Sequence, residues 1–195
     1  MKYAKKLDIV APLTYLHKAK VVLGQHNRIL GIHGKGVNDS VGLIRRYLPR
    51  KQIEMVKEIL PEQIRDKVIG VNYSEITLLA PHIHNMEQCV INFYQSTNGE
   101  VTKFYEGVVE LELDWSSDNG NAYYNVDIDK ITEVEQFIAQ PNDVWLLNSR
   151  QPHSVEWVND DREGMWKYEP NTKDSRWMVQ VYIDMPYDEV ASLFN

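Results

Sequence analysis

Residues 140–158 read QPNDVWLLNSRQPHSVEWV and contain two short apolar runs, DVWLLN and HSVEWV, separated by the turn-forming residues SRQP. Short runs rich in β-branched and aromatic residues, bounded by Asn, Ser and Pro, are typical of neighbouring antiparallel strands. We therefore predict a strand, a tight turn and a second strand that begins at His153.

The same pattern extends over most of the chain after Gly70. Six further candidate strands share it: VNYSEITLL, EQCVINFYQ, EVTKFYEGVVELELDW, AYYNVDI, ITEVEQFIAQ and RWMVQVYIDM. Turn-rich pieces such as STNG and SSDNGN separate them, as in an antiparallel all-β sandwich or barrel. About eight strands in this arrangement fit a jelly roll, a fold that can hold a metal site in its open mouth.

The residues before this region have a different character. Residues 1–39 contain glycines and asparagines that predict turns between short strands or extended pieces. From about Asn38 the pattern becomes helical through VGLIRRYL and RKQIEMVKEIL, and this amphipathic helix ends or kinks near Pro61. Four apolar residues recur there at helical spacing: Ile53, Val56, Ile59 and Leu60.

We expect one domain over residues 1–195, mainly β with N-terminal helices (α+β). A helical or irregular part over 1–69 packs on the barrel, the jelly-roll core covers 70–184, and a short helix forms at 185–195. A chain of 195 residues is long enough to bury its own core.

Composition narrows the classes of partner. A formal charge of −7 with dispersed lysines and arginines argues against nucleic acid and leaves a small metabolite as the expected partner. The single cysteine, Cys89, lies in an apolar run and is expected to be a small buried hydrophobe. No run has the length of a membrane span or of a signal peptide, so we expect a cytoplasmic protein. The oligomeric state stays open.

The segment PHIHNMEQCVINFY, from Pro81 to Tyr94, carries the main candidate for chemistry. On a strand, His82 and His84 project to the same face, and His153 could return to the same mouth. Three imidazoles on one face suit iron, nickel, copper or zinc, leave positions open, and favour an anionic chelating substrate. The alternative is that they are polar residues at a strand end. Surface positions are the default for the remaining histidines, His17, His26 and His33.

These motifs resemble the iron(II) and 2-oxoglutarate dependent oxygenases, which are double-stranded β-helix (jelly-roll) enzymes. The resemblance covers residues 70–184 and rests on PHIHNMEQCVINFY, EVTKFYEG, QPNDVWLLNSRQPHSVEWV and RWMVQVYI. It implies Fe(II), 2-oxoglutarate as co-substrate, and hydroxylation of an unidentified substrate. His82 matches the first metal ligand of that family and His153 the distal one. Position 84 departs from the family, which has a carboxylate there.

A site of three histidines is similar instead to certain cupin dioxygenases, which bind iron without 2-oxoglutarate. The cupin pattern places a glutamate a few residues after its His-x-His. Glu87 is the candidate for that glutamate, although its gap is one residue shorter than the pattern has.

The oxygenase resemblance also implies a basic residue that holds the far carboxylate of 2-oxoglutarate. Arg176, at the start of RWMVQVYI, is the candidate, because an arginine fork suits a carboxylate. Residues 159–175 would then be an inserted loop that serves as a lid over the mouth. Arg162, within this loop, is the alternative candidate for the carboxylate-binding residue.

Four other polar residues are candidates for the pocket. Asn92 matches an asparagine that the family often directs at its site, and alternation places it with Val90 and Tyr94. Lys103 and Tyr105 could also face the pocket, and Tyr73 is a weaker candidate.

Three hypotheses of function stay open at this point. The first is a dioxygenase that uses iron and 2-oxoglutarate. The second is a cupin-like enzyme, a dioxygenase or isomerase, whose three histidines hold a metal without that co-substrate. The third is a non-catalytic jelly roll with a decayed site, which binds a ligand or a partner chain.

Overall fold

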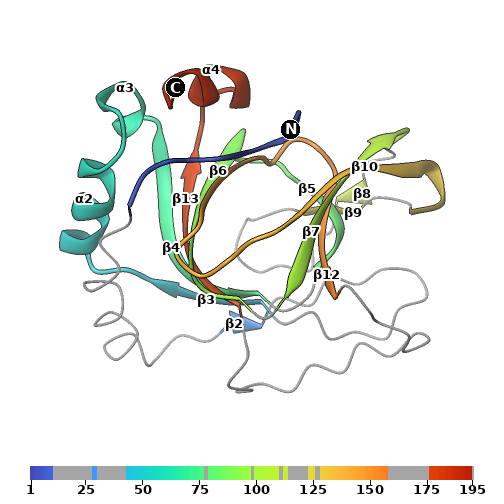
Figure 1. The fold of residues 1–195 in the computed structure, drawn as a ribbon, viewed down its shortest axis with the longest axis horizontal. Coiled ribbons are helices and arrows are strands. Elements are labelled where there is room, and N and C mark those ends of the chain that lie inside the picture. The colour runs from blue at the N-terminus through green and yellow to red at the C-terminus, as the bar shows by residue number, and fades with distance from the viewer. Residues whose placement is uncertain are drawn as a thin grey trace.

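The computed structural model describes residues 1–10, 28–29, 43–76, 79–97, 99–109, 112–113, 123–125, 128–157 and 176–194. These residues form two antiparallel sheets that curve around a common interior (Figure 1). Sheet A has seven strands in the order β1 (Ala4–Lys6), β11 (Val144–Asn148), β6 (Cys89–Ser96), β13 (Trp177–Ile183), β4 (Val68–Ile76), β3 (Leu43–Tyr47) and β2 (Arg28–Ile29). Sheet B has six in the order β10 (Ile131–Ile138), β7 (Glu100–Gly107), β12 (His153–Trp157), β5 (Leu79–His84), β9 (Tyr123–Asn125) and β8 (Glu112–Leu113).

Eight of these strands make a jelly roll. In chain order they are β4, β5, β6, β7, β10, β11, β12 and β13, and sheet A joins the sixth, third, eighth and first of them. Sheet B joins the fifth, fourth, seventh and second. Two facing sheets in which the chain crosses back and forth in this order form the jelly-roll architecture. The predicted fold class is confirmed. The domain boundaries stay a prediction.

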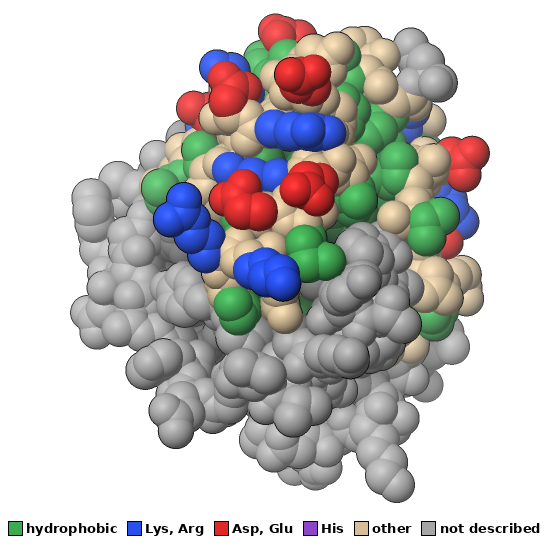
Figure 2. Space-filling model, turned by 90° about the vertical axis from the view of Figure 1, so that its left-hand side faces the viewer, with side chains coloured by type: hydrophobic (Ala, Val, Ile, Leu, Met, Phe, Trp, Pro, Cys, Tyr) green, Lys and Arg blue, Asp and Glu red, His purple; other side chains and the backbone are tan. Residues whose placement is uncertain are grey.

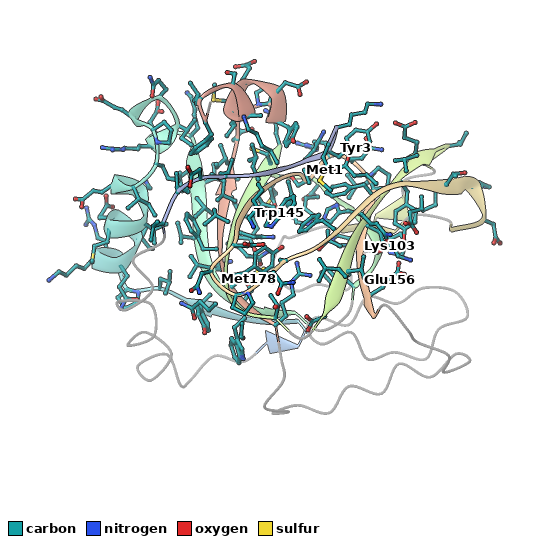
Figure 3. The ribbon with its side chains drawn as sticks, viewed as in Figure 1. Met1, Tyr3, Lys103, Trp145, Glu156 and Met178 are labelled. Atoms are coloured by element: carbon teal, nitrogen blue, oxygen red, sulfur yellow. The ribbon has the colours of Figure 1, made fainter. Side chains whose placement is uncertain are left out.

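Both faces of sheet A carry apolar residues, and those of each face belong to a different hydrophobic cluster. The inner cluster lies between the sheets and includes Tyr94, Trp145 and Met178, of which the last two are labelled in Figure 3. The outer cluster includes Phe93 and Val179, the neighbours of inner residues along the same strands. Successive side chains of a strand point to opposite faces, so one sheet serves both clusters.

Three helices cover the outer cluster: α2 (Arg50–Glu58), α3 (Glu62–Arg65) and α4 (Tyr187–Ser192). Each begins directly after a proline, which is its N-cap residue. The N-cap residue donates no N–H to the helix's own hydrogen bonds, so a proline there removes none of them. Val56 and Ile64 from α2 and α3 are buried in the outer cluster. The predicted helix is therefore confirmed over α2, and α3 follows Pro61 as a separate turn.

The helical prediction for VGLIRRYL is wrong, because residues 43–47 form β3. This strand pairs with β4 from Leu43 opposite Ile76 to Tyr47 opposite Asn72, and with β2 on its other side. Pro49 gives a physical reason, since a proline disfavours helical backbone in the residue before it. The helix can start only after Pro49, and the preceding residues extend sheet A.

The N-terminal strand β1 was not singled out by its sequence. It pairs with β11, and the carboxylate of Glu135 on β10 accepts hydrogen bonds from three successive backbone N–H groups. These are the N–H groups of Lys2, Tyr3 and Ala4, at 2.6, 3.1 and 3.0 Å. The ring of Tyr3 also stacks on Phe104 at 6.0 Å. This short strand is thus fixed to both sheets.

The face that carries α2 and α3 has acidic and basic side chains interspersed (Figure 2). Neither sign dominates the described part of that face. None of the helices in the described part of the chain has the length and apolar character that a membrane crossing requires.

Candidate metal centre

The three predicted histidines lie on two neighbouring strands of sheet B. His82 and His84 are alternate residues of β5, and His153 opens β12 directly opposite His82 in the antiparallel pairing. Residues opposite one another in a sheet share a face, so all three side chains enter the interior. Their exposed fractions are 0%, 5% and 5%.

A β-bulge in β5 sets the direction of these side chains. His82 pairs with His153 and Leu79 with Val155, so β5 has one residue more than β12 between the two pairs. The extra residue shifts the alternation, which lets both Leu79 and His82 face inward. Pro81, which has no N–H to donate to a ladder, lies at this irregularity. The sequence LAPHIH thus directs the histidines inward.

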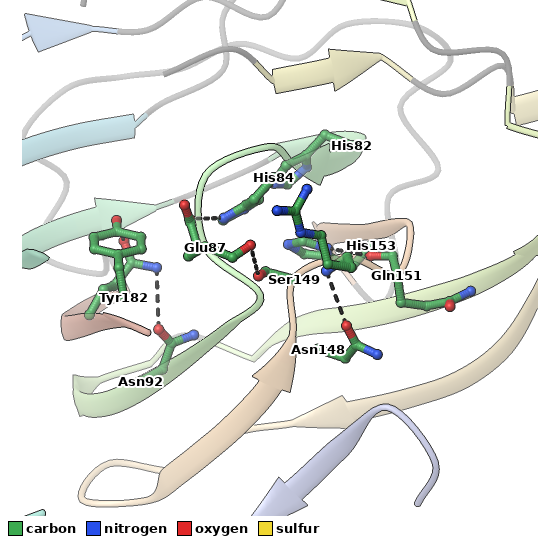
Figure 4. Close-up of polar contacts among 11 residues, drawn as sticks. His82, His84, Glu87, Asn92, Asn148, Ser149, Gln151, His153 and Tyr182 are labelled. Carbon is green, nitrogen blue, oxygen red and sulfur yellow. Dashed lines mark hydrogen bonds and ion pairs between the residues drawn. The ribbon is translucent and has the colours of Figure 1, made fainter. Parts of the chain in front are cut away.

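The ring nitrogens of the three histidines converge. Nε2 of His82 lies 3.1 Å from Nε2 of His84, and one nitrogen from each of the three rings lies within 4.8 Å of the others (Figure 4). Two imidazole nitrogens bound at about 2.1 Å to one metal ion, at a right angle, are about 3 Å apart. The donor set and its spacing therefore fit a transition-metal ion.

Outer hydrogen bonds orient two of the three rings. Nδ1 of His153 lies 2.9 Å from the carbonyl oxygen of Gln151, which can only accept, so Nδ1 carries the hydrogen. Burial, assisted by the proximity of His84 and Arg176, lowers the pKa of His153 to about 3. The ring is neutral near pH 7, and its Nε2 lone pair points to the interior. Nδ1 of His84 contacts Oε1 of Glu87.

Glu87 is not one of the converging groups. The three histidines form the cluster with metal-ligand spacing, and the Glu87 carboxylate occupies the other ring nitrogen of His84. By similarity to cupins, the sequence made Glu87 the candidate for the glutamate of that pattern. The short gap after His84 places it behind the histidine instead.

Arg176 directly precedes β13 and is 2% exposed. Its Nη1 donates to Oγ1 of Thr102 at 3.1 Å, and its Nη2 donates to the hydroxyl of Tyr94 at 2.7 Å. Nε has no hydrogen-bond partner, and no carboxylate in the described part of the chain pairs with the guanidinium. A buried cation is costly unless an anion compensates it, so this position suits an anionic ligand.

Asn92 joins Arg176 in a polar network on the inner face of sheet A. Asn92 Nδ2 donates to the Tyr94 hydroxyl at 3.2 Å, and Gln180 Nε2 donates to Asn92 Oδ1 at 3.2 Å. The Tyr182 hydroxyl donates to Gln180 Oε1 at 3.0 Å. Sequence reasoning singled out neither Gln180 nor Tyr182 as functional. Their alternation with Arg176 was the available signal.

Lys103 and Tyr105 lie on the opposite face of β7 from the candidate site. Phe104 is the β7 residue opposite His153, so its two neighbours point away from the interior. There Glu156 accepts a hydrogen bond from Tyr105 at 2.6 Å and pairs with Lys103 at 2.9 Å (Figure 3). The expectation that these two residues face the pocket is corrected by this register.

Tyr73 also lies away from the histidines. It belongs to the outer cluster, stacks on Trp177 at 5.0 Å, and donates its hydroxyl hydrogen to Gln95 at 2.7 Å. Arg162 and the expected lid over 159–175 lie outside the described residues, as do His17, His26 and His33.

Comparison with known proteins gives a limited result. No family model matches the sequence, and no curated protein matches it. Similar solved structures include two of oxalate decarboxylase, one of them from Bacillus subtilis. The Bacillus subtilis structure has 13% identity over 83% of this chain and 28% of that chain, with a TM-score of 0.39. The other, which concerns a reaction specificity switch, has 14% identity over 76% of this chain and 27% of that chain, with a TM-score of 0.36.

A third similar structure is Escherichia coli ycfD, with 11% identity over 95% of this chain and 50% of that chain, and a TM-score of 0.47. The chain thus spans between 27% and 50% of the length of these three structures. TM-scores of this size do not establish a shared fold. The jelly-roll assignment rests on the strand order of the two sheets.

Proposed function

We propose that this protein is a metal-dependent enzyme that binds a small anionic substrate directly at a three-histidine metal centre, without 2-oxoglutarate. The observation that carries this proposal is the convergence of His82, His84 and His153 on the inner face of sheet B. The substrate class follows from charge. Three neutral imidazoles would leave the ion's double positive charge uncompensated in the first shell, which favours an anionic chelating ligand.

The metal proposed is Fe(II), which imidazole donors suit. When bound, it would supply Lewis acidity and one-electron chemistry, as in a dioxygenase or an isomerase. The chain itself would position the three metal-binding rings and exclude water from the site. Buried strands fix the three rings, and the carbonyl oxygen of Gln151 keeps the Nε2 lone pair of His153 directed inward.

A second candidate function is an oxygenase that uses Fe(II) and 2-oxoglutarate. The observation that favours it is the buried guanidinium of Arg176, which has no carboxylate partner among the described residues. That arginine could hold the far carboxylate of 2-oxoglutarate, as the sequence resemblance implies. The oxygenase family's carboxylate ligand is replaced here by His84, and for this reason the first proposal leads.

An anaerobic titration tests the proposal. Metal-free protein is titrated with Fe(II) and then with 2-oxoglutarate, while the visible absorption spectrum is recorded. We expect Fe(II) to bind with a stoichiometry of one and no charge-transfer band to appear on adding 2-oxoglutarate. A band that needs both would favour the second candidate, and absence of Fe(II) binding would leave only a non-catalytic jelly roll.

Matched variants locate the metal. His153→Ala should abolish tight Fe(II) binding, because a site of three imidazoles loses a third of its donors. His33→Ala, which removes an imidazole that the sequence assigns to the surface, should bind Fe(II) as the wild type does. Arg176→Ala should keep Fe(II) binding, and a large rise in the 2-oxoglutarate requirement would again favour the second candidate.

A further inference from the structure

Glu87 is the buried carboxylate nearest in sequence to the histidine pair, and it contacts His84 rather than the point where the rings converge. Its exposed fraction is 8%. A buried carboxylate is costly unless it is hydrogen-bonded. The His84 ring supplies a hydrogen-bond partner for the Glu87 carboxylate.

The backbone around Glu87 is held on two sides. The Ser149 hydroxyl donates to the Glu87 carbonyl oxygen at 3.1 Å, and the N–H of Gln88 donates to the Ile183 carbonyl oxygen at 3.0 Å (Figure 4). The N–H of His84 donates in turn to the Ser149 carbonyl oxygen at 3.0 Å. The backbone groups of Glu87 and His84 are therefore both held by Ser149, in the turn between β11 and β12.

The contact decides which nitrogen of His84 carries the hydrogen and which carries the lone pair. An ionised carboxylate only accepts hydrogen bonds, so a neutral His84 must carry its hydrogen on Nδ1 and its lone pair on Nε2. Nε2 is the atom that lies 3.1 Å from Nε2 of His82. The carbonyl oxygen of Gln151 has the same role behind His153, but it carries no charge.

We propose that Glu87 is a positioning residue, which holds His84 with its Nε2 lone pair towards the metal and places a negative charge one imidazole away from the ion. This inference rests on the proposed metal centre. A carboxylate behind a ligating histidine fixes the ring and makes its nitrogen a stronger donor, and losing such a partner weakens metal binding by about 10- to 100-fold. The charge would also offset part of the metal's own charge without occupying a coordination position.

Three variants test this role with a metal-competition titration, in which a chromophoric chelator competes with the protein for Co(II) or Zn(II). Glu87→Ala should weaken metal affinity by about 10- to 100-fold. Glu87→Gln keeps the size and an acceptor oxygen but loses the charge, so its affinity should lie between wild type and Glu87→Ala. Ser149→Ala removes a bond to the Glu87 backbone and leaves the carboxylate, so it should weaken metal affinity far less than Glu87→Ala does.

A spectroscopic readout separates positioning from general stability. Nitrogen-15 NMR of the metal-free protein should show His84 with hydrogen on Nδ1 in the wild type, and a shift towards the other tautomer in Glu87→Ala. If wild-type protein binds no metal, the proposed centre fails. If wild type binds metal and both Glu87 variants bind it equally well with unchanged tautomers, the centre stands and the role of Glu87 is refuted.

Discussion

At the scale of single residues, alternation along β6 separates side chains that face the candidate site from side chains that face the helices. Asn92 and Tyr94 point into the polar interior, whereas Cys89 faces the helices in the outer cluster, with Sγ 3.4 Å from the Met185 carbonyl oxygen. The sequence-based expectation of Cys89 as a buried hydrophobe is confirmed. Burial, with the nearby charge of Glu87, raises the pKa of its thiol to about 12.

This thiol should make stability depend on alkaline pH. The ordinary pKa of the group is 9.0, so between pH 9 and about 12 the unfolded chain releases a proton that the folded protein retains. The free energy of unfolding should therefore fall by about 1.4 kcal/mol per pH unit above about pH 9 through this group. Chemical denaturation of wild type and Cys89→Ala checks this. Parallel pH profiles of the two proteins would contradict it.

At the scale of elements, the periodicity of single strands was readable from sequence, but their register was not. The alternation around Asn92 correctly predicted that Val90 and Tyr94 share its face. Lys103 and Tyr105 also alternate, yet only the pairing of Phe104 with His153 reveals which face of β7 is inward. Pairing between strands distant in sequence is a tertiary property that no local pattern encodes.

Local sequence patterns also could not predict two other features, again because pairing with other strands decides them. The strand β3 has an apolar pattern compatible with a helix, and its pairing with β4 decides its conformation. The bulge in β5 depends on a residue count relative to β12. The convergence of His82, His84 and His153 was expected from alternation along one strand and from the strand and turn that precede His153, and the structure brings the three residues together.

The strand β1 should loosen when its carboxylate acceptor is removed. Glu135→Ala deletes the acceptor of the Lys2, Tyr3 and Ala4 N–H groups. Hydrogen bonds to a charged group contribute about 1.5–3 kcal/mol each, so amide exchange at these residues should rise by about tenfold or more. Hydrogen-exchange mass spectrometry measures this. Glu133→Ala on the same strand is the control, and equal exchange in both variants would refute the role of Glu135.

The helix α3 should contribute to stability through one side chain. Ile64 is 0% exposed within the outer cluster, and Ile64→Ala should lower the free energy of unfolding by about 2–4 kcal/mol. Glu62→Ala, an exposed change in the same helix, should cost far less. Urea denaturation gives both values. Metal affinity should be unchanged in Ile64→Ala, because sheet A separates this residue from the histidines.

At the scale of the whole molecule, the jelly roll places the two halves of the candidate site on different sheets. Sheet B supplies the three histidines, and sheet A supplies Asn92 and Gln180, with Arg176 directly before β13. A ligand that touches both would bind only the folded state.

Metal should accordingly stabilise the fold. With free Fe(II) at about 100 times its dissociation constant, the free energy of unfolding should rise by about 2.7 kcal/mol. Anaerobic thermal denaturation with and without Fe(II) checks this, and His153→Ala should lose the increase. A melting temperature of the wild type that does not respond to Fe(II) would contradict the proposed centre.

The two-faced packing of sheet A has a further consequence, which concerns how this protein can change over generations. Substitutions in α2, α3 and α4 act on the outer cluster, whereas the polar groups opposite the histidines lie on the other side of the same strands. Mutations that restore lost stability can therefore accumulate beneath the helices while selection reshapes the interior for a new ligand. Substitutions that change stability and substitutions that change ligand specificity thus lie on opposite faces of one sheet.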